Sequence, residues 1–575
     1  MDSEQVEFPV IATRLSKKRF INLRWLLIPL GLILVSIPFA RPAYRYYKNW
    51  NASRLALQAL NSMRSGDFQT VGPIVTEAYR LTPENPDSLR AMAVFSSKFP
   101  QLKDKAKYCY ENLESLGKAT PEDRLEEASI YVSYGNLSSA DKLLAELPNA
   151  LRDSPKGLKA RFQICFARGE QMEAEELQRL YLRSLNSESD IKLSAVLESL
   201  KSPFPDIQSS AVTNLWQFTS KNDVTGLIAL EQLSKIPNLT KPDLLRLADL
   251  LKAHPMAQER HQYIVLSLLI RTSPERKEEI IQEKISSSGK RPLIELGLLF
   301  AWLIEQQKTK TILEILPDEI AKQNSDIFSP FIIALAIESK WDTLKNLITN
   351  GKSLPLNRGQ SFLLLAECRH ALHEGITVVK DEIRKALEAA SLEKDFVVIR
   401  KICAFAEKIN QPDLAILGYS HLEAEPRYRD FAFDQILRVA TSNHDTALMK
   451  STLERNITFY PDREIVAQRL VYLKLITGEQ MELAAQQAEE WADKDPNSSL
   501  SHLNHALASY RFRDEAKLKT LLDSISPDNL PPGQRAALAV LLDHAGRTNE
   551  AVIIAEKIPR SLLLPDEEAL LNTSF

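Results

Sequence analysis

The chain has 575 residues, with 72 Lys and Arg against 75 Asp and Glu, and 17 glycines. A formal net charge of −3 provides no basic excess for a phosphate backbone, which argues against nucleic acid as a partner. The cysteines are too few and too scattered for a disulfide scaffold, at Cys109, Cys165, Cys368 and Cys403. A chain of this length exceeds one hydrophobic core, and its richness in Leu, Ala, Glu and Lys predicts an all-α array of helices.

The N-terminal region has a basic tail, residues 1–19, followed by an apolar stretch. The segment from Trp25 to Ala40, WLLIPLGLILVSIPFA, carries no charge. Its ten Leu, Ile, Phe and Val residues favour membrane insertion by about 5 kcal/mol in total, which outweighs its two prolines. We predict a transmembrane helix over residues 20–43. A cleaved signal peptide is the alternative, but Pro38 stands where its cleavage site needs a small residue.

The charges that flank this segment predict its orientation. Arg and Lys residues near its ends bias the more basic side toward the cytoplasm. Five precede the segment and four follow it: Arg14, Lys17, Lys18, Arg19 and Arg24 against Arg41, Arg45, Lys48 and Arg54. We expect a single-pass membrane protein with a cytoplasmic N-terminus and a C-terminal part in the periplasm, anchored in a bacterial inner membrane.

Beyond residue 44 the sequence shows an internal period. In a window numbered from Ala52, Gly66 stands at position 15, Val71 at 20 and Pro83 at 32. Small residues at helical spacing let two antiparallel helices approach, glycine allows the turn between them, and proline ends the second helix. Windows from 121 and 155 repeat the glycine and the small residue five places on, as Gly135 with Ala140 and Gly169 with Ala174.

This pattern resembles the tetratricopeptide repeat, a helix-turn-helix unit of about 34 residues. The aromatic residue usual at position 4 of that family is absent from these units, and its leucine-glycine pair is clear only at Leu296-Gly297. Further windows begin near Lys290, Ser325, Ser361, Phe396, Ile465, Ser499 and Pro532. We therefore predict an α-solenoid of tetratricopeptide-like hairpins after one transmembrane helix. The repeats cover residues 44–188 and 290–575, and an irregular helical segment covers 189–289.

One cluster has the composition of a metal site. Cys368, His370, His373 and Glu374 lie in CRHALHE, where residues three or four apart share a helix face. A metal-dependent hydrolase centred on them is one alternative function. The order of residues is not that of the zinc-protease helix, and the repeat places Cys368 at a packing position. We expect no enzyme, no metal and no cofactor.

The resemblance also implies a binding surface, because positions 2, 5, 9, 12 and 13 line the groove of tetratricopeptide arrays. In the C-terminal units these positions give a mostly apolar strip with two cations: Arg469, Leu473, Leu503, Leu507, Tyr510 and Arg511. We predict that it binds a peptide or an amphipathic segment. If the frame is shifted by one residue, the leucines instead pack against a neighbouring helix.

Together these features predict a membrane-anchored scaffold. It would bind other proteins and position or assemble them at the membrane, in the secretion, outer-membrane or polysaccharide assembly of a bacterial cell envelope. A passive oligomerisation or spacer element is the remaining alternative. The sequence leaves the partner and the oligomeric state open.

Overall fold

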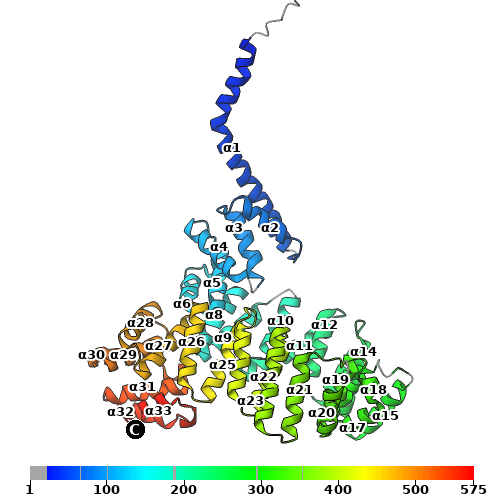
Figure 1. Ribbon diagram of the computed structural model, residues 1–575. Helices are drawn as coiled ribbons and strands as arrows, with labels where there is room; N and C mark the ends of the chain where they lie inside the picture. Colours follow the sequence, from blue (N-terminus) through cyan, green and yellow to red (C-terminus); the bar gives the residue numbers. More distant parts are fainter. Residues whose placement is uncertain are drawn as a thin grey trace, which may run out of the picture. The chain divides into compact units, whose positions relative to one another are not determined.

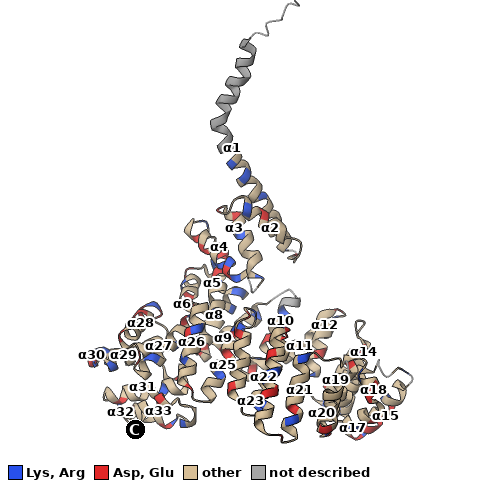
Figure 2. Cartoon of the chain, in the orientation of Figure 1, with Lys and Arg blue, Asp and Glu red and all other residues tan. Residues whose placement is uncertain are grey.

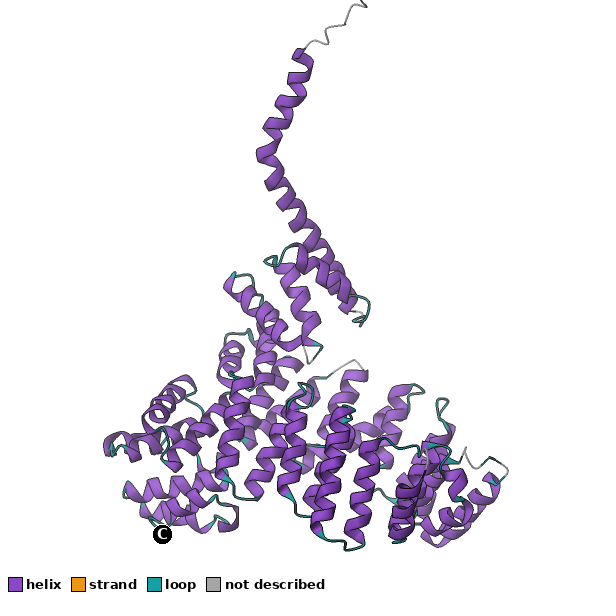
Figure 3. Ribbon diagram, viewed as in Figure 1, coloured by secondary structure: helices purple, strands orange, loops and turns teal. Residues whose placement is uncertain are grey.

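The computed structural model describes residues 23–64, 66–99, 102–185, 189–289, 291–292, 296–351 and 354–575, without the side chains of 23–43 and 189–191. The chain divides into two compact units, Met1–Asp123 and Arg124–Phe575. The described residues form α-helices and short 3-10 helices joined by loops, with no strand among them (Figure 3). This confirms the all-α prediction.

The first unit consists of helices packed around small residues. Ala52, Ala56 and Ala59 of the first helix are fully buried, and this helix contacts the next two. Small side chains at this spacing allow close packing between helices. The helices are α1 (Leu23–Arg64), α2 (Gly72–Leu81), α3 (Pro86–Ser97) and α4 (Lys103–Ser115).

Helix α1 corrects the prediction made for the N-terminal region. It continues without interruption from Leu23 through residue 43 to Arg64, and its described side chains include exposed Tyr44, Tyr46 and Trp50. Of the helices in the described ranges, none combines the length and the apolar character that crossing a bilayer requires. The predicted localisation, a single-pass protein with a periplasmic solenoid, is therefore wrong. Residues 20–22 of the predicted span lie outside the described residues.

The second unit is a succession of antiparallel helical hairpins (Figure 1). Its first half contains α5 (Pro121–Tyr134), α6 (Leu137–Ala145), α7 (Asn149–Arg152), α8 (Pro155–Arg168), α9 (Gln171–Ser184), α10 (Ser189–Ser199), α11 (Pro205–Phe218), α12 (Val224–Ser234), α13 (Lys241–Ala253), α14 (Glu259–Thr272), η2 (Pro274–Arg276), α15 (Lys277–Ser288), α16 (Gly297–Glu305), α17 (Thr309–Ile315), α18 (Asp318–Ala321) and α19 (Ser325–Ile337). Its second half contains α20 (Trp341–Asn350), α21 (Arg358–Ala371), α22 (Ile376–Leu392), α23 (Phe396–Lys408), α24 (Pro412–Glu423), α25 (Arg429–Ser442), α26 (Thr446–Phe459), α27 (Glu464–Thr477), α28 (Met481–Lys494), α29 (Ser499–Arg511), α30 (Glu515–Leu522), η4 (Pro527–Asn529), α31 (Pro532–His544), α32 (Thr548–Glu556), η5 (Arg560–Leu562) and α33 (Pro565–Leu571).

The hairpins follow the arrangement that the repeat pattern predicts. Windows from Pro121, Pro155, Phe396, Ser499 and Pro532 begin within a residue of the first helix of a pair. The small residues predicted at position 20 are fully buried, at Ala140, Ala174, Ala484 and Ala551. The helical solenoid is thus confirmed, and paired helices also occupy residues 189–289, where no repeat register could be assigned.

The turns inside the hairpins use a left-handed residue. Gly66, Gly135 and Gly169 have φ values of 88°, 75° and 83°, the conformation for which glycine was expected. In other hairpins a residue with a Cβ stands there, such as Ser339 with φ 56° and Lys394 with φ 53°. For an L-residue this conformation costs roughly 1–2 kcal/mol.

Ser339→Gly should therefore raise the free energy of unfolding by about 1 kcal/mol, since glycine relieves the steric cost of the left-handed turn. Urea unfolding followed by far-UV circular dichroism measures this change. Ser339→Ala is the matched control, because alanine keeps a Cβ in the same conformation. Equal stability of the glycine and alanine variants would contradict the explanation.

The second unit closes on itself at a junction, which we call the seam, between an N-terminal arm, α5 to α9, and a C-terminal arm, α27 to α33. In Figure 1 the cyan α6 and α8 lie beside the orange α27. Ser138 at the start of α6 donates its N–H to Glu464 over 2.8 Å, and the N–H of Glu464 donates to the carbonyl of Gly135 over 3.1 Å. These bonds satisfy groups at the ends of two helices, which have no partner within their own helix.

A buried ion pair holds the seam beside these bonds. Arg168 of α8 donates to Asp495 after α28 over 3.0 Å and to Asp141 over 2.9 Å. The side chains of Arg168 and Asp495 are only 8% and 5% exposed. Burial raises the pKa of the Asp495 carboxyl, and the nearby Arg168 guanidinium opposes this effect. Polar contacts thus join the two arms, and Ile465 of α27 also packs against the hydrophobic cluster of the N-terminal arm.

The last helix, α33, packs on α27 and α31. Glu567 of α33 accepts hydrogen bonds from the N–H of Leu564 over 2.8 Å and from the hydroxyl of Tyr472 over 2.9 Å. Its carboxyl lies against Gly533 of α31, where a Cβ would stand 2.0 Å from Oε1. Burial raises the pKa of Glu567. Close approach to this carboxyl requires a glycine at position 533.

Candidate functional site

An apolar groove runs between α16 and α19. It has a volume of about 800 Å³ and is lined by Gly297, Leu298, Ala301, Ile304, Ser325, Asp326, Ser329, Pro330 and Ile333. Leu298 and Ile333 are 46% and 43% exposed, and Ile337, one turn beyond Ile333, is 57% exposed. Contiguous exposed apolar side chains on a soluble surface mark interaction sites more often than scattered ones do.

Two residues shape this groove. At Gly297 a Cβ would lie 3.0 Å from the main-chain oxygen of Asp326, so a residue without a side chain allows the two helices to approach. Pro330 stands inside α19 and has no N–H, so the carbonyl of Asp326 four residues earlier loses its usual helical donor. The groove thus combines apolar walls with a main-chain acceptor.

The rim of the groove is acidic. The exposed Asp326 lines it, and the exposed Glu305 directly follows the lining residue Ile304. Within the described part of the chain neither carboxylate forms an ion pair. Elsewhere Lys and Arg alternate with Asp and Glu along the helices (Figure 2). An apolar segment with a basic residue therefore complements this groove.

The strip predicted in the C-terminal units lies largely in the core. Leu473, Leu503 and Leu507 are at most 1% exposed and belong to one hydrophobic cluster. Helix α29, which carries Leu503 and Leu507, contacts α27, α28, α30 and α31, so neighbouring helices of the same arm cover these leucines. Their side chains have no surface for a partner, and the alternative interpretation, packing against a neighbouring helix, describes them.

The polar members of the strip have separate environments. Arg511 donates to the carbonyls of Leu475 and Ile476 over 3.1 and 2.8 Å, which satisfies the end of α27. The ring of Tyr510 packs edge-to-face on that of His544, with centroids 4.9 Å apart. Arg469 lines a pocket at the seam. The structure does not bring the six predicted residues together on one open surface.

The CRHALHE cluster does not assemble into a metal site. Cys368 is fully buried, and burial raises its pKa to about 12, so its thiol stays protonated. Glu374 is paired with Lys345 and with Arg369, and its hydrogen bond to Lys345 lowers its pKa. His370 packs against Phe405, and His373 is exposed in a left-handed turn. The carboxylate that a metal would need is already neutralised by two cations.

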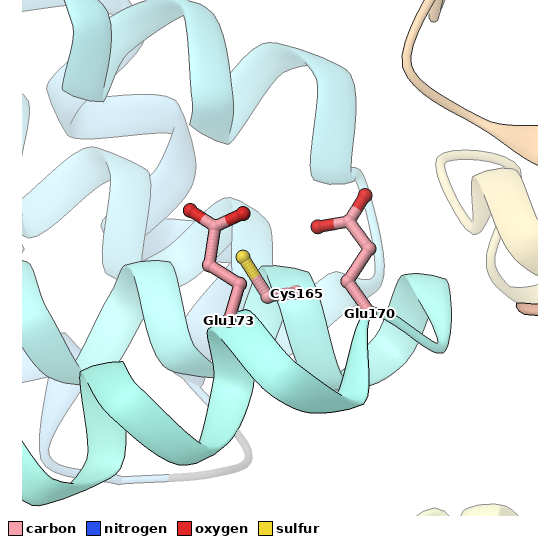
Figure 4. Close-up of side chains that lie close together, drawn as sticks. All are labelled: Cys165, Glu170 and Glu173. Carbon is pink, nitrogen blue, oxygen red and sulfur yellow. The ribbon is translucent and has the colours of Figure 1, made fainter.

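Another group of potential ligands lies on the N-terminal arm. Cys165, Glu170 and Glu173 have ligand atoms within 4.8 Å of one another, the one such group in the described residues (Figure 4). Burial raises the pKa of both Cys165 and Glu170, and the nearby Glu170 carboxylate raises the pKa of the thiol further. Since metal binding requires the thiolate, a thiol held protonated in this way does not favour a metal.

The similarity of this chain to known proteins is distant. No protein-family model matches the chain, and no curated protein matches its sequence. Among solved structures, the APC/C hetero-tetramer Cut9–Hcn1 is 14% identical over 91% of this chain and 96% of that chain, with a TM-score of 0.31. Naa15/Naa10 bound to HypK-THB is 12% identical over 89% and 94%, with a TM-score of 0.27. Yeast Tom70 is 14% identical over 88% and 96%, with a TM-score of 0.21.

The repeat pattern could have identified the groove between α16 and α19, although we predicted the binding surface in the C-terminal units. In the windows from Lys290 and Ser325, Leu298 and Ile333 both stand at position 9. Ala301 stands at 12 and Ile337 at 13, so the groove lies on positions that line the binding surface in the resembled family. Exposed apolar residues at these positions, rather than apolar residues in general, distinguish the groove.

Proposed function

We propose that this chain is a non-enzymatic scaffold that binds an apolar segment of a partner protein, with basic flanking residues, in the groove between α16 and α19. The observation that carries this proposal is the row of half-exposed Leu298, Ile333 and Ile337 beside acidic Asp326. Covering such side chains releases water from apolar surface, at about 25 cal/mol per Å². An amphipathic helix laid in a groove buries this surface while its polar face stays hydrated.

The acidic rim supports the choice of a basic partner. Asp326 and Glu305 offer charged acceptors, and the Asp326 carbonyl offers another acceptor inside the groove. Lys or Arg next to the apolar anchors would reach these oxygens. Opposite charges at a rim steer association and fix register more than they add affinity.

A displayed library of random 15-residue peptides, selected on the full chain, tests this proposal. We expect enriched peptides with apolar residues spaced three or four apart and with flanking Lys or Arg. The double variant Leu298→Asp/Ile333→Asp should weaken their binding by about tenfold or more, because buried anchors dominate such interfaces. Its far-UV circular dichroism should stay unchanged, since both side chains are half-exposed.

Leu417→Asp is the matched control. Leu417 is 42% exposed on α24. Leu417→Asp therefore places an aspartate at a similarly exposed site outside the groove. Peptide binding should survive this change. If Leu417→Asp lost as much peptide binding as the double variant, or if enriched peptides still bound the double variant, binding in the groove would be contradicted. Enrichment of acidic peptides would contradict the role of the rim.

A further inference from the structure

A second pocket lies in the seam between the two arms of the second unit. Its volume is about 260 Å³. Residues from both arms and from the loops at η4 and α28 surround it: Leu137, Ala167, Arg168, Glu464, Ile465, Gln468, Arg469, Asp495, Ser498, Leu500, Asn529, Pro531 and Gln534. The pocket is smaller than the α16–α19 groove, and its lining mixes apolar side chains with eight polar or charged ones.

Several hydrogen-bond donors in this pocket have no acceptor among the residues that the structure describes. Within the described part of the chain, the Arg469 guanidinium forms no ion pair and no hydrogen bond, and desolvation lowers its pKa. The Gln534 side chain is also without a hydrogen bond there, although this residue is only 7% exposed. Nε of Arg168 is buried and unpartnered as well. These three side chains come from α27, α31 and α8 and line the same space.

The acidic groups around the pocket are already engaged. Glu464 accepts from Ser138 and pairs with Lys494 over 3.1 Å, and Asp495 accepts from Arg168. Glu567, the carboxylate whose charge acts on Arg469, accepts from Tyr472 and Leu564 and makes no ion pair with Arg469 within 4 Å. The protein thus supplies unused donors and a cation, while the nearby carboxylates are engaged with other groups.

We propose that this pocket binds a small free oxyanion, of the phosphate or carboxylate class, between Arg469, Gln534 and Arg168. A partly buried cation without a partner is unfavourable, and an anion with several lone pairs would relieve this by accepting from all three side chains. Guanidinium and amide groups suit planar carboxylate and tetrahedral phosphate oxygens alike. Because Arg168 belongs to the N-terminal arm and Arg469 to the C-terminal arm, the bound anion links the two arms.

Isothermal titration of the full chain with inorganic phosphate, and separately with succinate, tests the site and separates the two sources of oxyanion. Sodium chloride at matched ionic strength controls for screening. We expect saturable binding of one oxyanion and a rise in Tm that follows its concentration, since ligands that bind only the folded state stabilise it. Binding without saturation, or an equal rise in chloride, would mean an adventitious ion only and would overturn the proposal.

Two variants make the test specific. Arg469→Gln should weaken anion binding by about tenfold or more, because it removes a charged donor. Without the anion it should keep or raise Tm, whereas loss of a purely structural arginine would lower it. Gln534→Glu places a carboxylate among the donors, so it should raise Tm without added anion and abolish the response to phosphate and succinate.

Arg547→Gln is the control for the loss of a cation. Arg547 forms exposed ion pairs with Glu550 and Asp523 on the same arm and does not line the pocket. Its variant should bind the oxyanion as the unaltered chain does. Equal weakening in Arg547→Gln and Arg469→Gln, or a normal anion response in Gln534→Glu, would refute a site in the seam.

Discussion

Arg168→Met should lower the free energy of unfolding by about 3–5 kcal/mol, because it leaves Asp495 as a buried carboxylate without its cation. Asp495 is 5% exposed, whereas Asp141, the other partner of Arg168, is 39% exposed and can regain water. Urea unfolding in buffer free of phosphate and carboxylates measures the change. The loss should be concentrated in the seam, the place where the two arms of the second unit meet.

The double variant Arg168→Met/Asp495→Asn provides the control for this prediction. Removing the second charge takes away the uncompensated carboxylate, so the double variant should regain most of the lost stability. A double variant as unstable as Arg168→Met would mean that packing of the arginine stem, rather than its charge, holds the arms together.

Gly533→Ala should destabilise the chain by about 2–3 kcal/mol, although alanine is the better helix former by about 1 kcal/mol. The reason is the Glu567 carboxyl, whose atoms would lie 2.0–2.1 Å from the new Cβ. Glu567 is 6% exposed, and Tyr472 and Leu564 bind both of its oxygens, so it has little room to move. Thermal unfolding, with protease sensitivity of α33 as a second measurement, shows the effect.

The sign of this effect should reverse when the obstructing carboxyl is removed. In a Glu567→Ala background, Gly533→Ala meets no carboxyl, and the helix propensity of alanine should then make it neutral or stabilising. If Gly533→Ala still destabilised the chain in the Glu567→Ala background, the close contact would involve another group.

The fold was predictable where it depends on local patterns. Gly135 and Ala140 stand five residues apart because one forms the turn and the other packs in the second helix, and the structure shows both features. The seam was not predictable, because Ser138 and Glu464 are 326 positions apart and neither belongs to a motif. The predicted membrane localisation is wrong because, within the described residues, no helix has both the length and the apolar character needed to cross a bilayer.

The binding residues were predictable only in part. The repeat frame marks the positions that can face a partner, but it cannot tell which units remain open. Leu503 and Leu507 are covered by the helices that α29 contacts, α27, α28, α30 and α31, whereas Leu298 and Ile333 at equivalent positions stay half-exposed. Arg469 was predicted as a cation of an apolar strip, and the structure shows it instead in a pocket lined by both arms, which only the closed seam creates.

The seam also determines the order in which the chain can fold during synthesis. Ser138 leaves the ribosome 326 residues before Glu464, an interval on the order of tens of seconds at usual rates of translation. During this interval the N-terminal arm has folded hairpins but lacks its counterpart. Its waiting surface carries Arg168, Asp141 and the main-chain oxygen of Gly135, all of which water can solvate. The polar groups of the junction therefore stay hydrated while the early arm waits, and its apolar part is covered only when Ile465 of α27 packs on it.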